Sequence, residues 1–334
     1  MIAVYSEAET RHRPEYEFEG NGFRLRRHPE AAGRADAIRD ALQSELGIAI
    51  VPPDPISDRD LEAVHDPGYL RFLQEISKTD TVVGPDTFAL RGIARVPRNP
   101  MAALGYYGTD PATPIGPGTW EPVRAAASVA WTAADLVAAE GEPHYAICRP
   151  PGHHAGRDYF GGFCYLNNAA LAAERLRRLG RVAIFDFDYH HGNGTQDIYY
   201  RSSDVFFASI HVDPEYGFPH FYGFADETGE VEGAGFNRNM PLPKTATVDD
   251  YRRAVDAVLE ALADFTPASL VVSVGYDAYE GDPVGGLCLS FDEFQRIGSQ
   301  TRSLGVPTVL VQEGGYSMDD IGRCAVAFAS GIIG

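Results

Sequence analysis

Short runs of apolar and β-branched residues alternate along this chain with longer amphipathic stretches. The short runs predict buried strands, at 2–5, 144–148, 182–188, 205–211, 270–275 and 308–312. The amphipathic stretches predict helices, at 31–46, 60–76, 120–140, 168–179, 248–264, 291–304 and 319–330. Strands that alternate with helices indicate an α/β fold with a doubly wound parallel sheet, in which ligands bind beyond the carboxyl ends of the strands.

The stretch 82–119 interrupts this alternation with many prolines and glycines. A loop of this length inside a compact domain is usually functional or disordered. Because it opens the part of the chain that carries the polar motifs, we expect a functional loop that shapes an entrance or makes a dimer contact. Farther along, Ser290 followed by Glu293 predicts a capping box at the start of the helix 291–304.

Polar segments follow four of the predicted strands: Pro-Gly-His-His (151–154), Asp-Phe-Asp-Tyr-His-His (186–191), Gly-Tyr-Asp (275–277) and Glu-Gly-Gly-Tyr (313–316). In a parallel sheet these segments lie along one edge. They supply Asp and His for a metal, two His for proton transfer and a Tyr hydroxyl for an oxyanion, which is the inventory of a metal-dependent hydrolase. A single Asp at a strand end more often caps a turn, but four such segments argue against that interpretation.

The segment 186–191 offers several metal ligands at once. Side chains alternate across a strand, so Asp186, Asp188 and His190 are expected on one face. Carboxylate and imidazole groups suit zinc, and a catalytic zinc typically takes three protein ligands and one water. Asp277, at the start of the loop after the strand 270–275, is the natural third ligand.

Longer motifs surround these segments: Gly-Tyr-Tyr (105–107), Gly-Thr-Trp-Glu (118–121), Cys-Arg-Pro-Pro-Gly-His-His-Ala-Gly (148–156), Gly-Gly-Phe-Cys-Tyr-Leu-Asn-Asn (161–168) and His-His-Gly-Asn-Gly-Thr-Gln-Asp (190–197). With them the chain resembles the arginase-like amidohydrolases that include the histone deacetylases, and most closely the bacterial acetylpolyamine amidohydrolases. The resemblance covers nearly the whole chain. It implies a single arginase/deacetylase-like domain over 1–334, in which the dispersed segments converge.

The resemblance also implies a role for each polar residue. Asp188, His190 and Asp277 match the zinc ligands of the family, and Asp186 matches a partner of the His153 imidazole. His191 falls outside the metal set and is expected to be structural. A structural potassium ion is implied near Asp186, Ser209 and the carbonyl groups of Asp188, His190 and Ile210.

The expected chemistry is hydrolysis of an amide assisted by zinc, which polarises the carbonyl and lowers the pKa of water. His154 is expected to serve as both base and acid, with His153 as its electrostatic partner. Asn193 stands where the family has Asp or Asn, so it gives His154 a neutral hydrogen-bond partner. The Tyr316 hydroxyl is expected to bind the oxyanion.

The resemblance further implies a narrow tunnel with Phe163 and Phe218 as walls. Asp110, Glu17 and Glu30 are weaker candidates for contacting a distal ammonium group of the substrate. In the acetylpolyamine amidohydrolases a loop insertion in the region of 82–119 pairs two subunits, so we expect a homodimer.

Composition limits the partners. The net charge is -19 and the pI is about 4.8, which argues against nucleic acid and favours approach by small cations. The four cysteines form no C-x-x-C pair and are expected to be reduced. No leader-like or membrane-spanning stretch is evident, so a cytoplasmic enzyme without a membrane partner is expected.

The leading interpretation is a zinc amidohydrolase that releases acetate from a small acetylated cation such as acetylputrescine, acetylcadaverine or acetylspermidine. One alternative is a deacylase of acetyl-lysine in proteins or peptides, or of another small amide, which would need a wider entrance. An arginase-like enzyme with two manganese ions is disfavoured because no second His-rich ligand set is apparent. A binding protein that sequesters polyamines is disfavoured because His154 and Tyr316 are intact.

Overall fold

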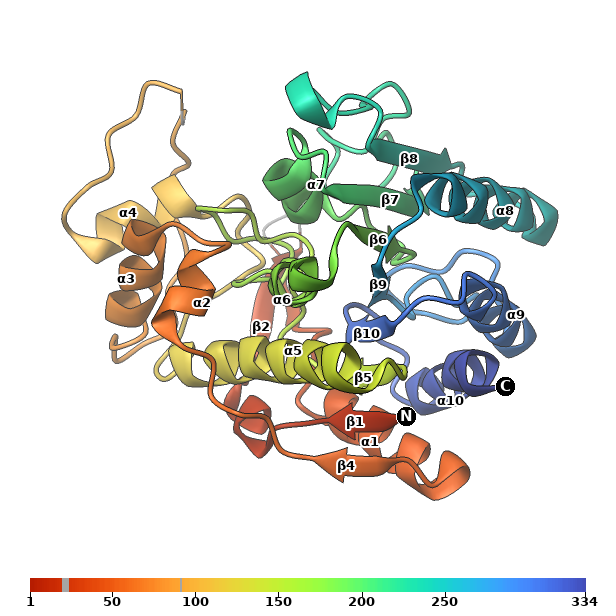
Figure 1. The fold of residues 1–334 in the computed structure, drawn as a ribbon. Helices are drawn as coiled ribbons and strands as arrows, with labels where there is room; N and C mark the ends of the chain where they lie inside the picture. Colours follow the sequence, from red (N-terminus) through yellow and green to blue (C-terminus); the bar gives the residue numbers. More distant parts are fainter. Residues whose placement is uncertain (20–23, 91) are drawn as a thin grey trace.

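The computed structural model describes residues 1–19, 24–90 and 92–334, and these are organised around an eight-stranded parallel sheet with helices on both faces (Figure 1). The sheet order is β4-β1-β5-β10-β9-β6-β7-β8, and a separate antiparallel hairpin pairs β2 with β3. The strands are β1 (Ile2–Val4), β2 (Tyr16–Glu19), β3 (Arg24–Arg27), β4 (Ala49–Val51), β5 (His144–Ala146), β6 (Val182–Asp186), β7 (Val205–Val212), β8 (Asn237–Leu242), β9 (Ser269–Val274) and β10 (Thr308–Gln312).

Helices cover the two faces of the sheet in separate groups. The α-helices are α1 (Gly33–Leu46), α2 (Asp58–Glu62), α3 (Pro67–Ile76), α4 (Pro100–Tyr107), α5 (Trp120–Glu140), α6 (Asn168–Leu176), α7 (Asn193–Tyr199), α8 (Val248–Phe265), α9 (Phe291–Arg302) and α10 (Ile321–Ile333). One apolar layer joins α3, α4, α5 and α6 to the sheet, and a second joins α1, α8, α9 and α10 to its other face. Among the described helices none is long and apolar enough to cross a membrane.

The central strands are buried on both faces. On β6, Val182 and Ile184 belong to the first apolar layer, whereas Ala183 and Phe185 belong to the second. Strands of this kind read as continuous apolar runs, which is why their positions could be predicted. The predicted α/β fold with a parallel sheet is confirmed.

The sheet order positions the polar segments. The four strands that precede them, β5, β10, β9 and β6, are neighbours at the centre of the sheet. All four strands run in the same direction. The segments 151–154, 313–316, 275–277 and 186–191 therefore meet beyond one edge.

Several predicted element bounds are wrong. The helix predicted at 60–76 is two helices, because Pro67 cannot continue α2 and Asp66 caps α3 by accepting from the backbone N–H of Gly68 and Tyr69. Strands β4 and β8 were not predicted, since each lies at a sheet edge and carries no long apolar run. The Ser290 side chain makes no cap hydrogen bond, and Glu293 instead pairs with Arg252.

The segment 82–119 is not wholly irregular, because its described part contains α4. Asn99 caps this helix by accepting from Met101 N, and Pro100 occupies its first turn. Gly105 lies against the preceding loop, where a Cβ atom would overlap the carbonyl group of Thr87. The helix therefore anchors a long surface segment to the α3 side of the molecule.

Candidate active site

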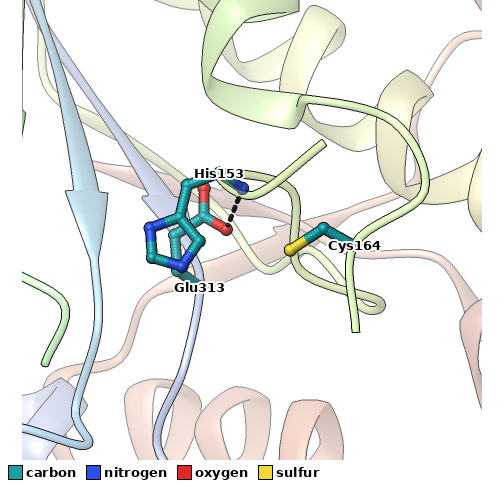
Figure 2. A group of neighbouring side chains, drawn as sticks. All are labelled: His153, Cys164 and Glu313. Atoms are coloured by element: carbon teal, nitrogen blue, oxygen red, sulfur yellow. Dashed lines mark hydrogen bonds between the residues drawn. The ribbon is translucent and has the colours of Figure 1, made fainter. Parts of the chain in front are cut away.

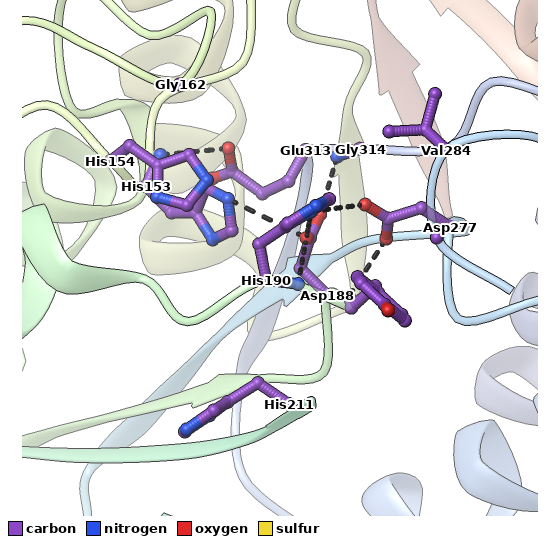
Figure 3. Close-up of polar contacts among 12 residues, drawn as sticks. His153, His154, Gly162, Asp188, His190, His211, Asp277, Val284, Glu313 and Gly314 are labelled. Carbon is purple, nitrogen blue, oxygen red and sulfur yellow. Dashed lines mark hydrogen bonds and ion pairs between the residues drawn. The ribbon is translucent and has the colours of Figure 1, made fainter. Parts of the chain in front are cut away.

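Asp188, His190 and Asp277 form a compact group of potential metal ligands at the centre of the sheet edge. One ligand atom from each lies within 4.8 Å of the others. His190 Nδ1 is 3.0 Å from Asp277 Oδ2 and 3.3 Å from Asp188 Oδ1. Both carboxylates are fully buried, and Figure 3 shows the three side chains turned toward one another.

The chain reaches this arrangement by local turns and not by strand alternation. Strand β6 ends at Asp186, two residues earlier than predicted. Asp186 Oδ1 then accepts from Asp188 N, and Asp188 Oδ1 accepts from His190 N, at 3.1 and 2.9 Å. Such side-chain to backbone bonds turn the chain. Asp188 and His190 thus reach Asp277, whereas Asp186 points to His153, and the prediction that all three share a face is wrong.

Two glycines make room for the carboxylates. A Cβ atom on Gly314 would lie 2.5 Å from both Asp188 Oδ2 and Asp277 Oδ2, and one on Gly275 would overlap Asp188. Without a side chain at Gly314, the backbone comes within hydrogen-bond distance of the cluster, and Gly314 N donates to Asp188 Oδ2 at 2.8 Å. The glycine of the Glu-Gly-Gly-Tyr motif that follows Glu313 is therefore required by the ligand cluster.

The electrostatics of the cluster fit a cation. Burial and the nearby charge of Asp188 raise the pKa of Asp277 to about 7. Burial acts in the same direction on Asp188, but His153 and the hydrogen bonds from His190 outweigh it and leave its pKa lowered. Two buried carboxylates this close repel each other unless positive charge lies between them, and two carboxylates with one imidazole are a donor set that suits zinc. The residues present fit the predicted metal.

Two histidines stand beside the cluster with different partners. His153 Nδ1 donates to Asp186 Oδ2 at 3.0 Å, and His154 Nδ1 donates to Asn193 Oδ1 at 2.8 Å. Burial lowers the pKa of His153, but the carboxylates of Asp188 and Asp186 outweigh it and raise the pKa to about 10. Burial and the neighbouring His153 lower the pKa of His154 well below its usual value. The pair thus offers one cationic and one neutral imidazole.

Tyr316 lies on a turn that is held from two sides. Asp282 Oδ2 accepts from the backbone N–H of Tyr316 and Ser317, at 2.6 and 3.1 Å. The Arg34 guanidinium donates to the carbonyl groups of Glu313 and Gly315 and lies 4.8 Å from the centroid of the Tyr316 ring. Neither Arg34 nor Asp282 was identified from the sequence, because nothing local marks them as supports of a distant turn.

Glu313 has a structural part in the site. Its Oε2 accepts from Gly152 N and His153 N, at 2.6 and 3.0 Å, and so ties the end of β10 to the histidine segment. With His153 and Cys164 it forms a second group of potential ligands (Figure 2). Cys164 Sγ already donates to Gly162 O, and burial raises its pKa, which keeps it a thiol. The predicted zinc site therefore remains with Asp188, His190 and Asp277.

A cavity of about 260 Å³ leads to these groups, and His154, His190 and Tyr316 line it. Both predicted wall residues, Phe163 and Phe218, also line it. The Phe218 ring lies edge-on to His154 with centroids 4.8 Å apart, and the Phe163 ring lies edge-on to Tyr316 at 6.0 Å.

The three acidic residues considered for a distal ammonium group differ in position. Glu17 and Asp110 line the cavity, but Glu30 does not. Glu30 is fully buried and pairs with Arg34 and Arg149, at 3.0 and 2.7 Å. An ammonium contact by Glu30 is therefore wrong, since its charge is balanced inside the protein.

Asp110 acts on the cavity wall through the backbone. Its Oδ2 accepts from Gly162 N at 2.6 Å, and its Oδ1 accepts from Ala112 N at 2.7 Å. Thr113 Oγ1 accepts from Phe163 N at 2.9 Å. Phe163 has a φ of 69°, a conformation that non-glycine residues rarely adopt. Asp110 and Thr113 thus hold the strained turn that presents the Phe163 ring.

Three of the predicted potassium ligands, Asp186, Ser209 and Ile210, lie on the adjacent strands β6 and β7. Asp186 of β6 is the register partner of Ser209 of β7, and Ile210 follows. Ser209 Oγ lies 2.7 Å from His211 Nδ1. His191, predicted to be structural, is buried and lies 3.1 Å from Gln196 Oε1 through its Nε2. The potassium site stays a prediction.

With this fold and this set of residues, the chain belongs to the histone deacetylase family, since the family model described as the histone deacetylase domain matches residues 28–332. The predicted family resemblance is confirmed, and with it the general class of hydrolase and deacetylase.

Bacterial acetylpolyamine amidohydrolases are similar over the full length. The chain is 40% identical to acetylpolyamine amidohydrolase 1 of Pseudomonas aeruginosa, with 100% of this chain and 99% of that protein covered. It is 39% identical to the acetylpolyamine amidohydrolase of Mycoplana ramosa, with 91% and 92% covered. The crystal structure of acetylpolyamine aminohydrolase from Burkholderia pseudomallei matches with a TM-score of 0.95 at 36% identity, covering 99% of this chain and 98% of that one.

Proposed function

We propose that this protein is a zinc-dependent amidohydrolase that releases acetate from N-acetylated polyamines or related small acetylated amines. The observation that carries the proposal is the convergence of three functions on one cavity: His190 of the ligand cluster, His154 and Tyr316 all line it. The similarity to acetylpolyamine amidohydrolases supports the same chemistry.

Asp188, His190 and Asp277 would hold the ion. When bound, a divalent ion supplies Lewis acidity, which polarises an amide carbonyl and makes water easier to deprotonate. Proton transfer and stabilisation of the oxyanion are carried out by side chains of the protein. His153, oriented by Asp186, adds positive charge beside the reacting atoms.

His154 has the geometry of a general base. Because Asn193 Oδ1 accepts from Nδ1, the proton of neutral His154 sits on Nδ1 and leaves Nε2 as an acceptor. His154 takes a proton from water as the new C–O bond forms, and returns it to the nitrogen as the C–N bond breaks. The products are acetate and the free amine. The Tyr316 hydroxyl donates to the carbonyl oxygen while that oxygen carries negative charge.

The size of the cavity favours a small substrate. Its volume of about 260 Å³ lies just below the usual range of ligand pockets, which suits a thin chain held between Phe163 and Phe218. A deacylase of acetyl-lysine proteins with the same residues is the alternative enzyme, and a polyamine-binding protein is the alternative without catalysis.

One assay separates these functions. Acetate release is measured with acetylputrescine, acetylcadaverine, acetylspermidine and an acetyl-lysine peptide, before and after chelation and after zinc is restored. We expect chelation to abolish turnover, zinc to restore it, and the small amines to exceed the peptide in kcat/KM. Faster turnover of the peptide would favour the protein deacylase, and tight binding without turnover would favour the binding protein.

Homodimerisation through the segment 82–119 is part of the proposal. Its described residues expose several large apolar side chains, among them Leu90 and Ile93, which are 78% and 86% exposed. Residue 91 lies outside the described residues. Exposed apolar patches of this kind mark association surfaces. Sedimentation of the wild type and of a Leu90→Asp, Ile93→Asp variant tests this: we expect a dimer and a monomer, respectively.

A further inference from the structure

His28 lies directly behind the wall of the active-site cavity. Its side chain is buried, and its ring packs against the Phe163 ring with centroids 4.5 Å apart. Phe163 and Ala112 line the cavity, but His28 does not. The residue follows strand β3, and its backbone N–H donates to Glu15 O at 3.1 Å. His28 is therefore fixed in the fold and acts on a substrate only through this wall.

The two ring nitrogens fix the orientation of the His28 ring. Nδ1 accepts from Glu30 N at 3.2 Å. Burial lowers the pKa of His28 to about 4, so the ring is neutral at neutral pH. Because Nδ1 is an acceptor, the proton of the neutral ring is on Nε2, which donates to Ala112 O at 3.1 Å. The ring thus joins the segment 28–30 to the loop that follows α4.

Further contacts connect this segment to the inner end of the cavity. Glu30 pairs with Arg34 at 3.0 Å, and the Arg34 guanidinium lies 4.8 Å from the centroid of the Tyr316 ring. The Tyr316 ring in turn lies edge-on to Phe163 at 6.0 Å. Together with the contact between Phe163 and His28, these interactions form a closed circuit. The wall ring and the tyrosine proposed to bind the oxyanion are therefore both supported by the same short segment.

We propose that His28 is a positioning residue that holds the Phe163 ring at its place beside Tyr316 and so sets how tightly the cavity holds the alkyl chain of a substrate. This proposal rests on the proposed function and adds to it a residue that determines specificity from outside the cavity. Asp110 and Thr113 hold the backbone of the Phe163 turn, whereas His28 holds the ring itself.

His28→Asn removes the support of the ring and keeps the local turn. An Asn side chain accepts readily from the backbone N–H two residues on, so the contact to Glu30 N is preserved. The ring against Phe163 and the donor to Ala112 O are lost. The substrates are N-ethyl-, N-propyl-, N-butyl- and N-pentylacetamide, which carry no charge and differ only in methylene groups.

We measure kcat/KM of zinc-loaded protein for these four amides. In wild type, kcat/KM should rise by up to about fourfold with each methylene that the wall covers. His28→Asn should lose about twofold with N-ethylacetamide and about tenfold or more with N-pentylacetamide, because a displaced ring covers fewer methylenes. A loss that is equal for all four amides would give His28 a general structural role and overturn the proposal.

His144→Asn is the matched control. His144 is also buried, and its Nδ1 accepts from Ile2 N at 3.1 Å, but it begins strand β5 at the end of the sheet opposite the site. Any loss in this variant should be the same for all four amides. Thermal unfolding shows whether each variant is folded. Should His28→Asn not fold, His28→Gln tests the same dependence on chain length, since its amide can still donate to Ala112 O.

Acetate release from acetylputrescine tests the proposed function separately. If wild type hydrolyses neither acetylputrescine nor the neutral amides, the proposed function is wrong. Crystal structures of wild type and His28→Asn then decide the positioning role, as they do if only the neutral amides are inert. A Phe163 ring that moves away from Tyr316 in the variant supports the proposal, and a ring that stays in place overturns it.

Discussion

At the inner end of the cavity the functional side chains follow directly from central strands, whereas at its mouth they come from a hairpin and long loops. Asp277 and Tyr316 stand within a few residues of β9 and β10, which are buried on both faces. Glu17 lies on the β2–β3 hairpin, and Asp110 lies in the segment that follows α4. The groups proposed for the chemistry thus follow the buried strands at the centre of the fold, and the groups at the mouth come from the hairpin and loops that connect the elements.

The two regions are also supported in different ways. The inner end is held by charged groups buried deep in the protein, such as Arg34 against the carbonyl groups of Glu313 and Gly315. The mouth is held by neutral or half-exposed contacts, such as Thr113 on Phe163 and Arg26 on Glu17. Substitutions at the inner end should therefore abolish function or stability, and those at the mouth should redistribute specificity.

The largest effect is expected from Asp277→Ala. It removes one of three proposed ligands, so zinc content should fall from one ion per chain to nearly none and acetate release should become undetectable. Metal content by mass spectrometry and a turnover assay measure this, and circular dichroism should show most of the fold retained. Asp80→Ala, at an exposed position, is the control and should keep both metal and activity. Full activity of metal-free Asp277→Ala would contradict the ligand assignment.

The inner end of the site could be predicted from sequence because buried strands are recognised as short apolar runs. Polar residues that closely follow such runs, including Asp277 and Tyr316, can therefore be identified as candidate site residues. The assignment of Asp188 and His190 to one strand face with Asp186 failed, since the aspartate carboxylates accept hydrogen bonds from the backbone and turn the chain after Asp186.

The supports of the site could not be predicted, because their partners lie far away along the chain. Arg34 bonds to residues about 280 positions away, and its own helix carries no signal that the side chain will be buried. Glu30 was given the wrong partner, and the backbone partners of Asp110 were missed, for the same reason: a carboxylate in sequence does not reveal which distant donors will satisfy it. The ion pair between Glu17 and Arg26 was likewise not predicted, because it depends on the β2–β3 hairpin, which contains no apolar run.

Arg34→Met should have the next largest effect, on stability. It leaves Glu30 with one cationic partner fewer and removes the donors to the turn before Tyr316. Breaking a buried ion pair by removing one member costs about 3 to 5 kcal/mol, and urea unfolding should show a loss of this size. Arg39→Met, in the same helix with a more exposed ion pair, should cost less than about 1 kcal/mol. Equal stability of the two variants would show that Arg34 does not support the inner end.

Tyr316→Phe should lower kcat on the order of a hundredfold, equivalent to about 2.7 kcal/mol, with little change in KM. The hydroxyl is needed where negative charge develops on the carbonyl oxygen and contributes little to the bound ground state. Steady-state kinetics measure this, with His154→Ala as a second variant that should be at least as damaging. A rise in KM alone would make the hydroxyl a ground-state contact and exclude the oxyanion role.

Asp110→Asn should have the smallest effect, a drop in kcat/KM of about tenfold, or roughly 1.4 kcal/mol. One amide oxygen cannot accept from both Gly162 N and Ala112 N as the two carboxylate oxygens do, so the turn that presents Phe163 should loosen. Because the decrease in kcat/KM comes from a displaced Phe163 ring and not from a lost charge contact, it should be equal for N-acetylcadaverine and for N-pentylacetamide, a neutral amide of similar length. A direct contact between Asp110 and a distal ammonium group predicts instead that only the charged substrate suffers. The ratio of the two losses therefore decides whether Asp110 shapes the mouth or binds the substrate, and we expect a ratio near one.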